Sequence, residues 1–160
     1  MTPAPSAHPL ASPAPPWVHL LAGAGGAAAL PPAPPGFAVR TLDGRRCQTK
    51  PTLLDELARV LQFPAHFGKT WDALEDCLTD LDWLPHAGYW LFITSAHRLL
   101  ARDDASYATF VELLEAVGRA WATGATGHPG RTAVPFHTVL VVPVDRLSAR
   151  SSWGAPRLPG

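Results

Sequence analysis

Apolar positions in the middle of the chain follow two periodicities, one typical of strands and one typical of helices. Apolar runs that alternate or are continuous predict three β-strands, at residues 37–42, 89–93 and 139–142. Apolar side chains at helical spacing predict three amphipathic helices, near residues 51–61, from residue 70 onward, and over residues 106–121. Strands that alternate with helices favour right-handed crossovers. We therefore expect an α/β fold in which a small three-stranded parallel sheet packs against three or four helices.

The two ends of the chain differ from this middle part in composition. Ten of the eighteen prolines fall in the first 35 residues, which contain no Lys, Arg, Asp or Glu. Residues 1–16 are therefore expected to form a flexible Pro- and Ala-rich tail. Residues 17–36 fit either an extra N-terminal strand or a linker, and both remain open. Residues 37–143 are the expected folded domain, and the arginine-rich residues 144–160 are expected to form a flexible basic tail.

Whole-chain charge and cysteine content exclude several classes of function. Lys plus Arg and Asp plus Glu number 13 each, so the net charge of zero gives no electrostatic footprint for nucleic acid or an anionic membrane. Cys47 and Cys77 lack the spacing of a zinc site or a disulfide framework. No apolar stretch is long enough to cross a bilayer, and no basic residue precedes one to form a signal peptide. We expect a cytoplasmic protein.

The helix expected after residue 70 is strongly acidic. The chain between residues 72 and 82 has five acids and no base: Asp72, Glu75, Asp76, Asp80 and Asp82. Like charges at i, i+4 oppose helix formation by about 0.2–0.5 kcal/mol per pair. The zero net charge therefore conceals −5 in this segment and +5 in the rest of the chain.

Two interpretations of the acidic helix remain open. A solvated face that keeps a small domain soluble is the usual explanation of a charge run. Interspersed Lys or Arg would serve solubility better, because mixed charges support a helix. The second interpretation is a surface that mimics polyphosphate and binds a strongly basic protein cleft.

Residues 63–81 carry a longer pattern around this helix. A proline and an aromatic pair before Gly68 are followed by Asp-Ala-Leu-x-Asp-Cys-Leu at residues 72–78. This pattern resembles the signature of the barstar family, intracellular inhibitors of secreted ribonucleases. The resemblance implies three parallel strands packed against helices. It also implies a mechanism in which the acidic helix and the loop before it block the active site of a microbial ribonuclease.

The resemblance assigns roles to single residues. Asp76 matches the carboxylate that takes the place of an RNA phosphate, and Asp72 matches a second contact acid. His66 matches the aromatic residue that packs on the catalytic histidine of the ribonuclease. Gly68 matches the loop residue at which the backbone approaches the partner, and Thr79 matches a hydroxyl at the rim of the contact.

The pattern also has departures from the family. Glu75 stands where the best-known inhibitor has a tryptophan, and Lys69 replaces an acidic or variable residue. His66 and Phe67 stand in place of two tyrosines, while Thr70 keeps the role of a helix cap. The candidate partner-binding residues are His66, Phe67, Gly68, Asp72, Glu75, Asp76, Thr79 and Asp80. The later helix offers Glu112 and Glu115 as candidates for a further acidic contact.

We expect a monomeric inhibitor of the antitoxin type, which binds a basic protein such as a guanyl-specific or related microbial ribonuclease. The alternative is a barstar-like domain that binds another basic protein without inhibiting a ribonuclease; Glu75 and Lys69 favour it. A divalent metal held by Asp72, Asp76 and His66 is a third possibility, although no second cluster of ligands is evident. No phosphate-binding loop or nucleophile motif is present, so we expect neither an enzyme nor a cofactor.

Overall fold

A computed structural model describes residues 8–23, 32–125 and 132–158, and these form a four-stranded parallel sheet. The strands are β1 (Val18–Ala22), β2 (Phe37–Asp43), β3 (Gly88–Thr94) and β4 (Phe136–Val142). They lie in the order β1-β4-β3-β2, so β3 and β4 are central. The three predicted strands and the α/β class are confirmed. The apolar run near residue 18 is a fourth strand, paired in parallel with β4, so the linker alternative is wrong for that run.

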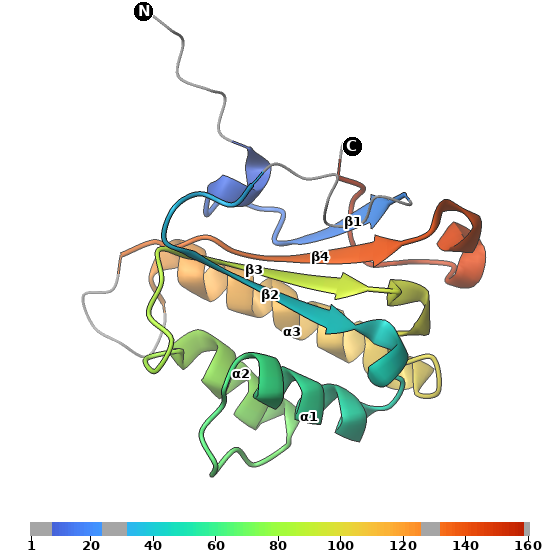
Figure 1. Cartoon of the computed structure of the whole chain (residues 1–160), viewed down its shortest axis with the longest axis horizontal. Coiled ribbons are helices and arrows are strands. Elements are labelled where there is room, and N and C mark those ends of the chain that lie inside the picture. The colour runs from blue at the N-terminus through green and yellow to red at the C-terminus, as the bar shows by residue number, and fades with distance from the viewer. Residues whose placement is uncertain (1–7, 24–31, 126–131, 159–160) are drawn as a thin grey trace, which may run out of the picture.

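Three α-helices cover one face of this sheet (Figure 1): α1 (Lys50–Val60), α2 (Trp71–Asp80) and α3 (Asp104–Thr123). All three were predicted, and α3 extends two residues beyond the expected range at each end. Their apolar sides and the inner face of the sheet form the main core, which includes Leu42, Leu53, Leu57, Leu74, Leu78, Leu91, Ile93, Phe110 and Val117. No helix in the described part of the chain is long and apolar enough to cross a membrane.

A second, smaller apolar cluster lies on the other face of the sheet. Its buried members are Leu10, Leu21, Trp90, Phe92, Val139, Val141 and Leu158. Leu10 belongs to η1, a short 3-10 helix (Pro9–Ala11), and is completely buried. The indole N–H of Trp90 donates a hydrogen bond to the Leu10 carbonyl at 2.7 Å. Residues 8–16 therefore pack on the sheet and do not form the expected flexible tail; residues 1–7 lie outside the described part.

The expected flexible tail at the C-terminus is also anchored to the fold, through Trp153 and Leu158. It begins with a 3-10 helix, η5 (Val144–Ala149), and then passes Trp153, which is only 8% exposed. The Tyr107 hydroxyl donates to the Trp153 carbonyl at 2.7 Å. Backbone hydrogen bonds join Leu20 N to Pro156 O and Leu158 N to Leu20 O. The segment therefore lies alongside β1, and burial of Trp153 and Leu158 favours this arrangement.

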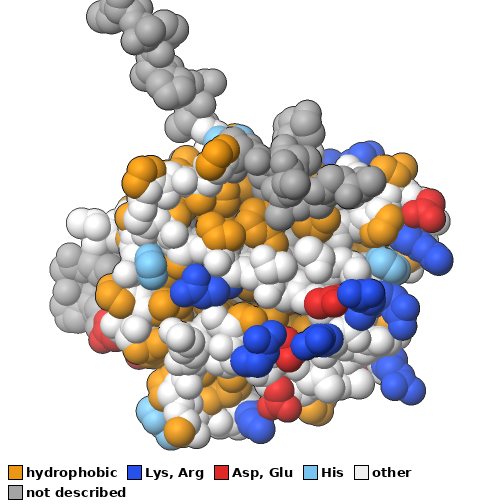
Figure 2. All heavy atoms as spheres, in the orientation of Figure 1, with side chains coloured by type: hydrophobic (Ala, Val, Ile, Leu, Met, Phe, Trp, Pro, Cys, Tyr) orange, Lys and Arg blue, Asp and Glu red, His pale blue; other side chains and the backbone are white. Residues whose placement is uncertain are grey.

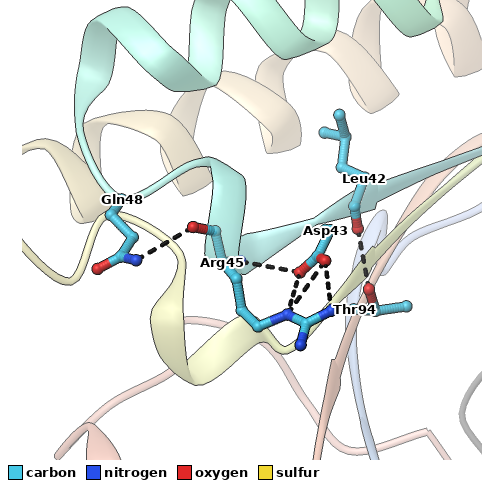
Figure 3. Close-up of polar contacts among 5 residues, drawn as sticks. All are labelled: Leu42, Asp43, Arg45, Gln48 and Thr94. Atoms are coloured by element: carbon cyan, nitrogen blue, oxygen red, sulfur yellow. Dashed lines mark hydrogen bonds and ion pairs between the residues drawn. The ribbon is translucent and has the colours of Figure 1, made fainter.

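The turn after β2 fixes the edge of the sheet nearest α1 (Figure 3). Asp43 accepts a hydrogen bond from the backbone N–H of Arg45 at 2.9 Å and forms an ion pair with its guanidinium at 2.8 Å. The Thr94 hydroxyl donates to the Leu42 carbonyl at 3.2 Å, which ties this turn to the end of β3. Gly44, between these groups, is buried.

We expect Gly44→Ala to destabilise the protein by about 1–3 kcal/mol, as overpacking of a tight site does. A Cβ at this position would collide with the Ser95 carbonyl and lie 2.8 Å from the Thr94 carbonyl, and neither backbone group can rotate away. The measurement is urea unfolding followed by circular dichroism. Gly68→Ala is the matched control, because its Cβ would meet nothing closer than 3.6 Å. Equal midpoints for the two variants would contradict the packing described here.

Candidate functional site

The loop between α1 and α2 is held by aromatic contacts within the protein. The rings of Phe63 and Phe67 meet edge to face with centroids 4.9 Å apart, and Phe63 meets Trp83 in the same way at 6.1 Å. The Phe67 backbone N–H donates to the Pro64 carbonyl at 3.0 Å. Phe67 is therefore half-buried, and His66 next to it is exposed. The loop presents His66 outward because Phe67 anchors it inward.

Both ends of α2 are fixed by specific backbone features. The Ala73 N–H donates to the Thr70 side-chain oxygen at 3.0 Å, so the predicted N-cap is confirmed. The helix ends at Asp80, and Leu81 is its C-cap residue with a left-handed backbone conformation (φ 50°). Leu78 is buried, and its carbonyl accepts a hydrogen bond from the Trp121 indole at 2.8 Å. These contacts fix the rotation of α2 about its axis, and with it the direction of its polar face.

The polar face of α2 carries exposed acids. Asp72, Glu75 and Asp76 are exposed, and none forms an ion pair with another described residue. Asp72 and Asp76 are one turn apart, so their side chains are neighbours on the surface. Thr79 is half-buried, and its hydroxyl donates to the Glu75 carbonyl at 2.8 Å. The carboxylates of this face are thus left to solvent or to a partner.

Acids near α1 are arranged differently. Arg59 pairs with Glu56 at 2.7 Å, and Lys69 pairs with Asp55 at 3.1 Å. Figure 2 shows Lys and Arg mixed with Asp and Glu over the face formed by α1 and the end of β2. Lys69 therefore directs its charge to α1, and the acidic face of α2 keeps its negative charge.

A shallow pocket of about 210 Å³ lies between the loop and α2. It brings together five of the eight predicted residues: His66, Phe67, Gly68, Asp76 and Asp80. Asp72, Glu75 and Thr79 do not line it. Pro64, Ala73, Cys77 and Trp83 complete the lining.

Trp83 is the largest of the four lining residues that were not predicted to belong to the site. Its indole N–H donates to the Leu61 carbonyl at 2.9 Å, which joins the end of α1 to the chain after α2. An aromatic residue directly after an acidic helix was the available signal. It could not separate a pocket wall from ordinary packing, since the carbonyl that Trp83 binds is 22 residues away.

Cys77 lies in this pocket as a thiol. Partial burial raises the pKa of Cys77, and the nearby charges of Asp80 and Asp76 raise it further. The thiolate is the reactive form, so this environment opposes nucleophilic chemistry.

Glu112 and Glu115 line a different cavity, of about 480 Å³, between α3 and the C-terminal segment. Tyr107 and Val111 from α3 and Ser152 from the C-terminal segment contribute to its walls. Burial raises the pKa of the Glu115 carboxyl. Neither acid reaches the pocket beside α2.

The metal alternative lacks a donor set. Within residues 8–23, 32–125 and 132–158, no three His, Cys, Asp or Glu side chains converge closely enough to hold an ion. Asp72, Asp76 and His66 therefore do not converge on a common point that could hold an ion.

Comparison with known proteins assigns the central part of the chain to a family. No curated protein matches the sequence. A family model described as Barstar (barnase inhibitor) matches residues 37–141, about two-thirds of the chain. The match runs from the start of β2 into β4 and contains the whole of α2, its preceding loop and the pocket between them. β1 and the C-terminal segment lie outside it. The chain belongs to the Barstar family.

Proposed function

We propose that this protein inhibits a microbial ribonuclease by placing α2 and the preceding loop in the basic active-site cleft of the enzyme. One observation supports the proposal most strongly: Asp72, Glu75 and Asp76 form an exposed acidic face, and none of them is paired with a cation among the described residues. Like charges at this spacing destabilise the helix, so the arrangement of these acids does not contribute to the stability of the fold. Binding of a positively charged partner would explain their presence. The proposal places the inhibitor in the cytoplasm as a monomer and requires neither a metal nor a cofactor.

Asp76, Asp72 and His66 would each make a different contact with the ribonuclease. Asp76 stands between the acidic face and the pocket, where its carboxylate can replace a phosphate among Arg, Lys and His side chains of the enzyme. Asp72 lies in the first turn of α2, and its negative charge is favoured there by the helix dipole. His66 offers an exposed ring beside the pocket for stacking on an aromatic or imidazole group.

A second candidate is binding to another basic protein without inhibition of a ribonuclease. Glu75 supports it, because an exposed carboxylate replaces a large aromatic anchor in the middle of the surface. Stoichiometric titration of a guanyl-specific ribonuclease separates the two candidates. Loss of activity at one equivalent supports inhibition, and full activity at micromolar excess rejects it for that enzyme.

Asp76→Ala is expected to weaken binding to the ribonuclease by about 2–5 kcal/mol, because it leaves buried positive charge in the enzyme without a partner. This corresponds to a loss of roughly 30-fold to several thousand-fold in affinity. The inhibition constant is measured with a fluorogenic RNA substrate. Asp145→Ala is the matched control, since it removes the same charge from an exposed position on η5. Equal inhibition constants for Asp76→Ala and the parent would remove Asp76 from the phosphate-mimic role.

Gly68→Ala tests whether the loop backbone touches the partner. The added methyl group fits within this protein, since its nearest neighbour is the Ala73 Cβ at 3.6 Å. We expect unchanged thermal stability and an inhibition constant that is at least 10-fold higher. The methyl group would separate the loop from the surface of the ribonuclease. Unchanged inhibition by a stable Gly68→Ala protein would place the contact elsewhere.

The association rate should fall steeply as ionic strength rises, while the dissociation rate changes much less. Screening shortens the range over which the acidic face steers a basic partner. Stopped-flow measurements between 50 and 500 mM salt provide the test. An Asp72→Asn/Asp76→Asn double variant should show a flatter salt dependence; equal slopes for variant and parent would contradict electrostatic steering by this face.

A further inference from the structure

The face of the sheet away from the helices contains two buried histidines. His19 in β1 is 2% exposed, and His137 in β4 is completely buried. The His19 Nε2 atom lies 2.9 Å from His137 Nδ1, so the rings share one hydrogen bond. His137 Nε2 lies 2.6 Å from the Ser12 carbonyl oxygen. A carbonyl oxygen only accepts, so His137 carries its proton on Nε2, and its Nδ1 accepts a hydrogen bond from the Nε2–H group of His19.

This arrangement holds the preceding part of the chain against the sheet. We call residues 8–16 the N-terminal strap; η1 lies within it and above the sheet in Figure 1. Three side-chain N–H groups bind its carbonyls: Trp90 binds Leu10, His137 binds Ser12 and Trp17 binds Pro13, at 2.6–2.8 Å. Leu10 adds its buried side chain to the apolar cluster beneath. The His137 bond is the one of these three that depends on a titratable group.

The surroundings of the histidine pair oppose a positive charge. Burial, with smaller contributions from the neighbouring His137 and His8, lowers the pKa of His19 to about 4, and the Pro16 carbonyl acts against this shift. Burial also lowers the pKa of His137, to which His8 contributes; the Ser12 and Pro16 carbonyls act against it. His8 is on the strap, His19 is on β1 and His137 is on β4. Among the described residues, no carboxylate contributes to either pKa.

We propose that the His19–His137 pair is a proton-operated latch, whose protonation releases the N-terminal strap from the sheet. A proton on His137 Nδ1 would face the existing N–H of His19 at hydrogen-bond distance. Moving the His19 proton to its other nitrogen relieves that contact but leaves one charge buried without a counter-ion. A second proton cannot be accommodated at all. Release admits water to both rings and removes this cost.

The direction of the pH effect follows from the lowered pKa values. The released strap leaves both rings in solvent, with pKa values near 6.5, so the released state binds more protons than the closed state. Closure is therefore complete above pH 6.5 and weakens progressively as the pH falls toward 4. The apolar side chains beneath Leu10 become accessible at the same time.

Solvent exchange of indole protons tests the latch in the full chain. We expect the Trp90 Nε1 proton, which binds the strap, to lose protection with a midpoint between pH 6.5 and about 4 in NMR spectra. The Trp121 Nε1 proton, which binds α2 on the helical side, should stay protected over that range. Simultaneous loss at both indoles would mean general unfolding and would overturn the proposal, as would a Trp90 proton that stays protected to pH 4.

A matched pair of variants assigns the transition to the latch. His19→Phe/His137→Gln removes both titrating rings and retains a donor toward the Ser12 carbonyl; its Trp90 proton should stay protected at pH values that release the parent strap. His86→Gln changes an exposed histidine and should leave the transition in place. If the double variant does not fold, imidazole NMR titration of the parent decides instead. Midpoints of His19 and His137 that do not coincide with strap release would reject the latch.

Discussion

The parallel sheet must be covered on both faces, and the other parts of the structure are arranged around this requirement. Strands such as β3 and β4 carry apolar side chains on both sides, and nearly all of these are buried. The three helices cover one face, where Leu91 and Ile93 meet α1 to α3. The opposite face, with Trp90 and Phe92, is covered by the N-terminal strap and the end of the chain. The two terminal segments are ordered, despite their tail-like composition, because Leu10 and Leu158 are buried against the apolar side chains of this face.

Coverage of the inner face also orients the candidate site. α2 packs on α3 through buried Leu74 and Leu78, and the Trp121 indole fixes its rotation through the Leu78 carbonyl. With α2 held in this orientation, the side chains of Asp72, Glu75 and Asp76 are exposed to solvent. Several described acids elsewhere on the molecule are paired with Arg or Lys, as Asp43 is with Arg45 (Figure 3). Asp72, Glu75 and Asp76, by contrast, form no ion pair with another described residue.

The Barstar match separates residues 37–141, which contain the candidate site, from the segments before and after them. Residues 37–141 contain the acidic helix, its loop and the pocket, which together support the proposed inhibitory contact. The additions, β1 with its strap and the C-terminal segment, bind each other through Leu20 and lie on the sheet away from α2 (Figure 1). The histidine pair joins β1 of the addition to β4 of the matched region. A change of pH can therefore act on the outer face while α2 keeps its supports.

The sequence by itself determined the elements whose signals are local. The strands 37–42, 89–93 and 139–142, the helices, the Thr70 cap and the acidic face follow from periodicity and from neighbouring residues, because helix and strand geometry fixes the spacing within each element. Tertiary structure decided what depends on distant partners: Trp83 in the pocket wall, Lys69 paired with Asp55, and the strap anchored by buried Leu10. In each case the deciding contact joins residues well separated in the chain. Burial between distant segments is a property of the assembled sheet, and no local pattern specifies it.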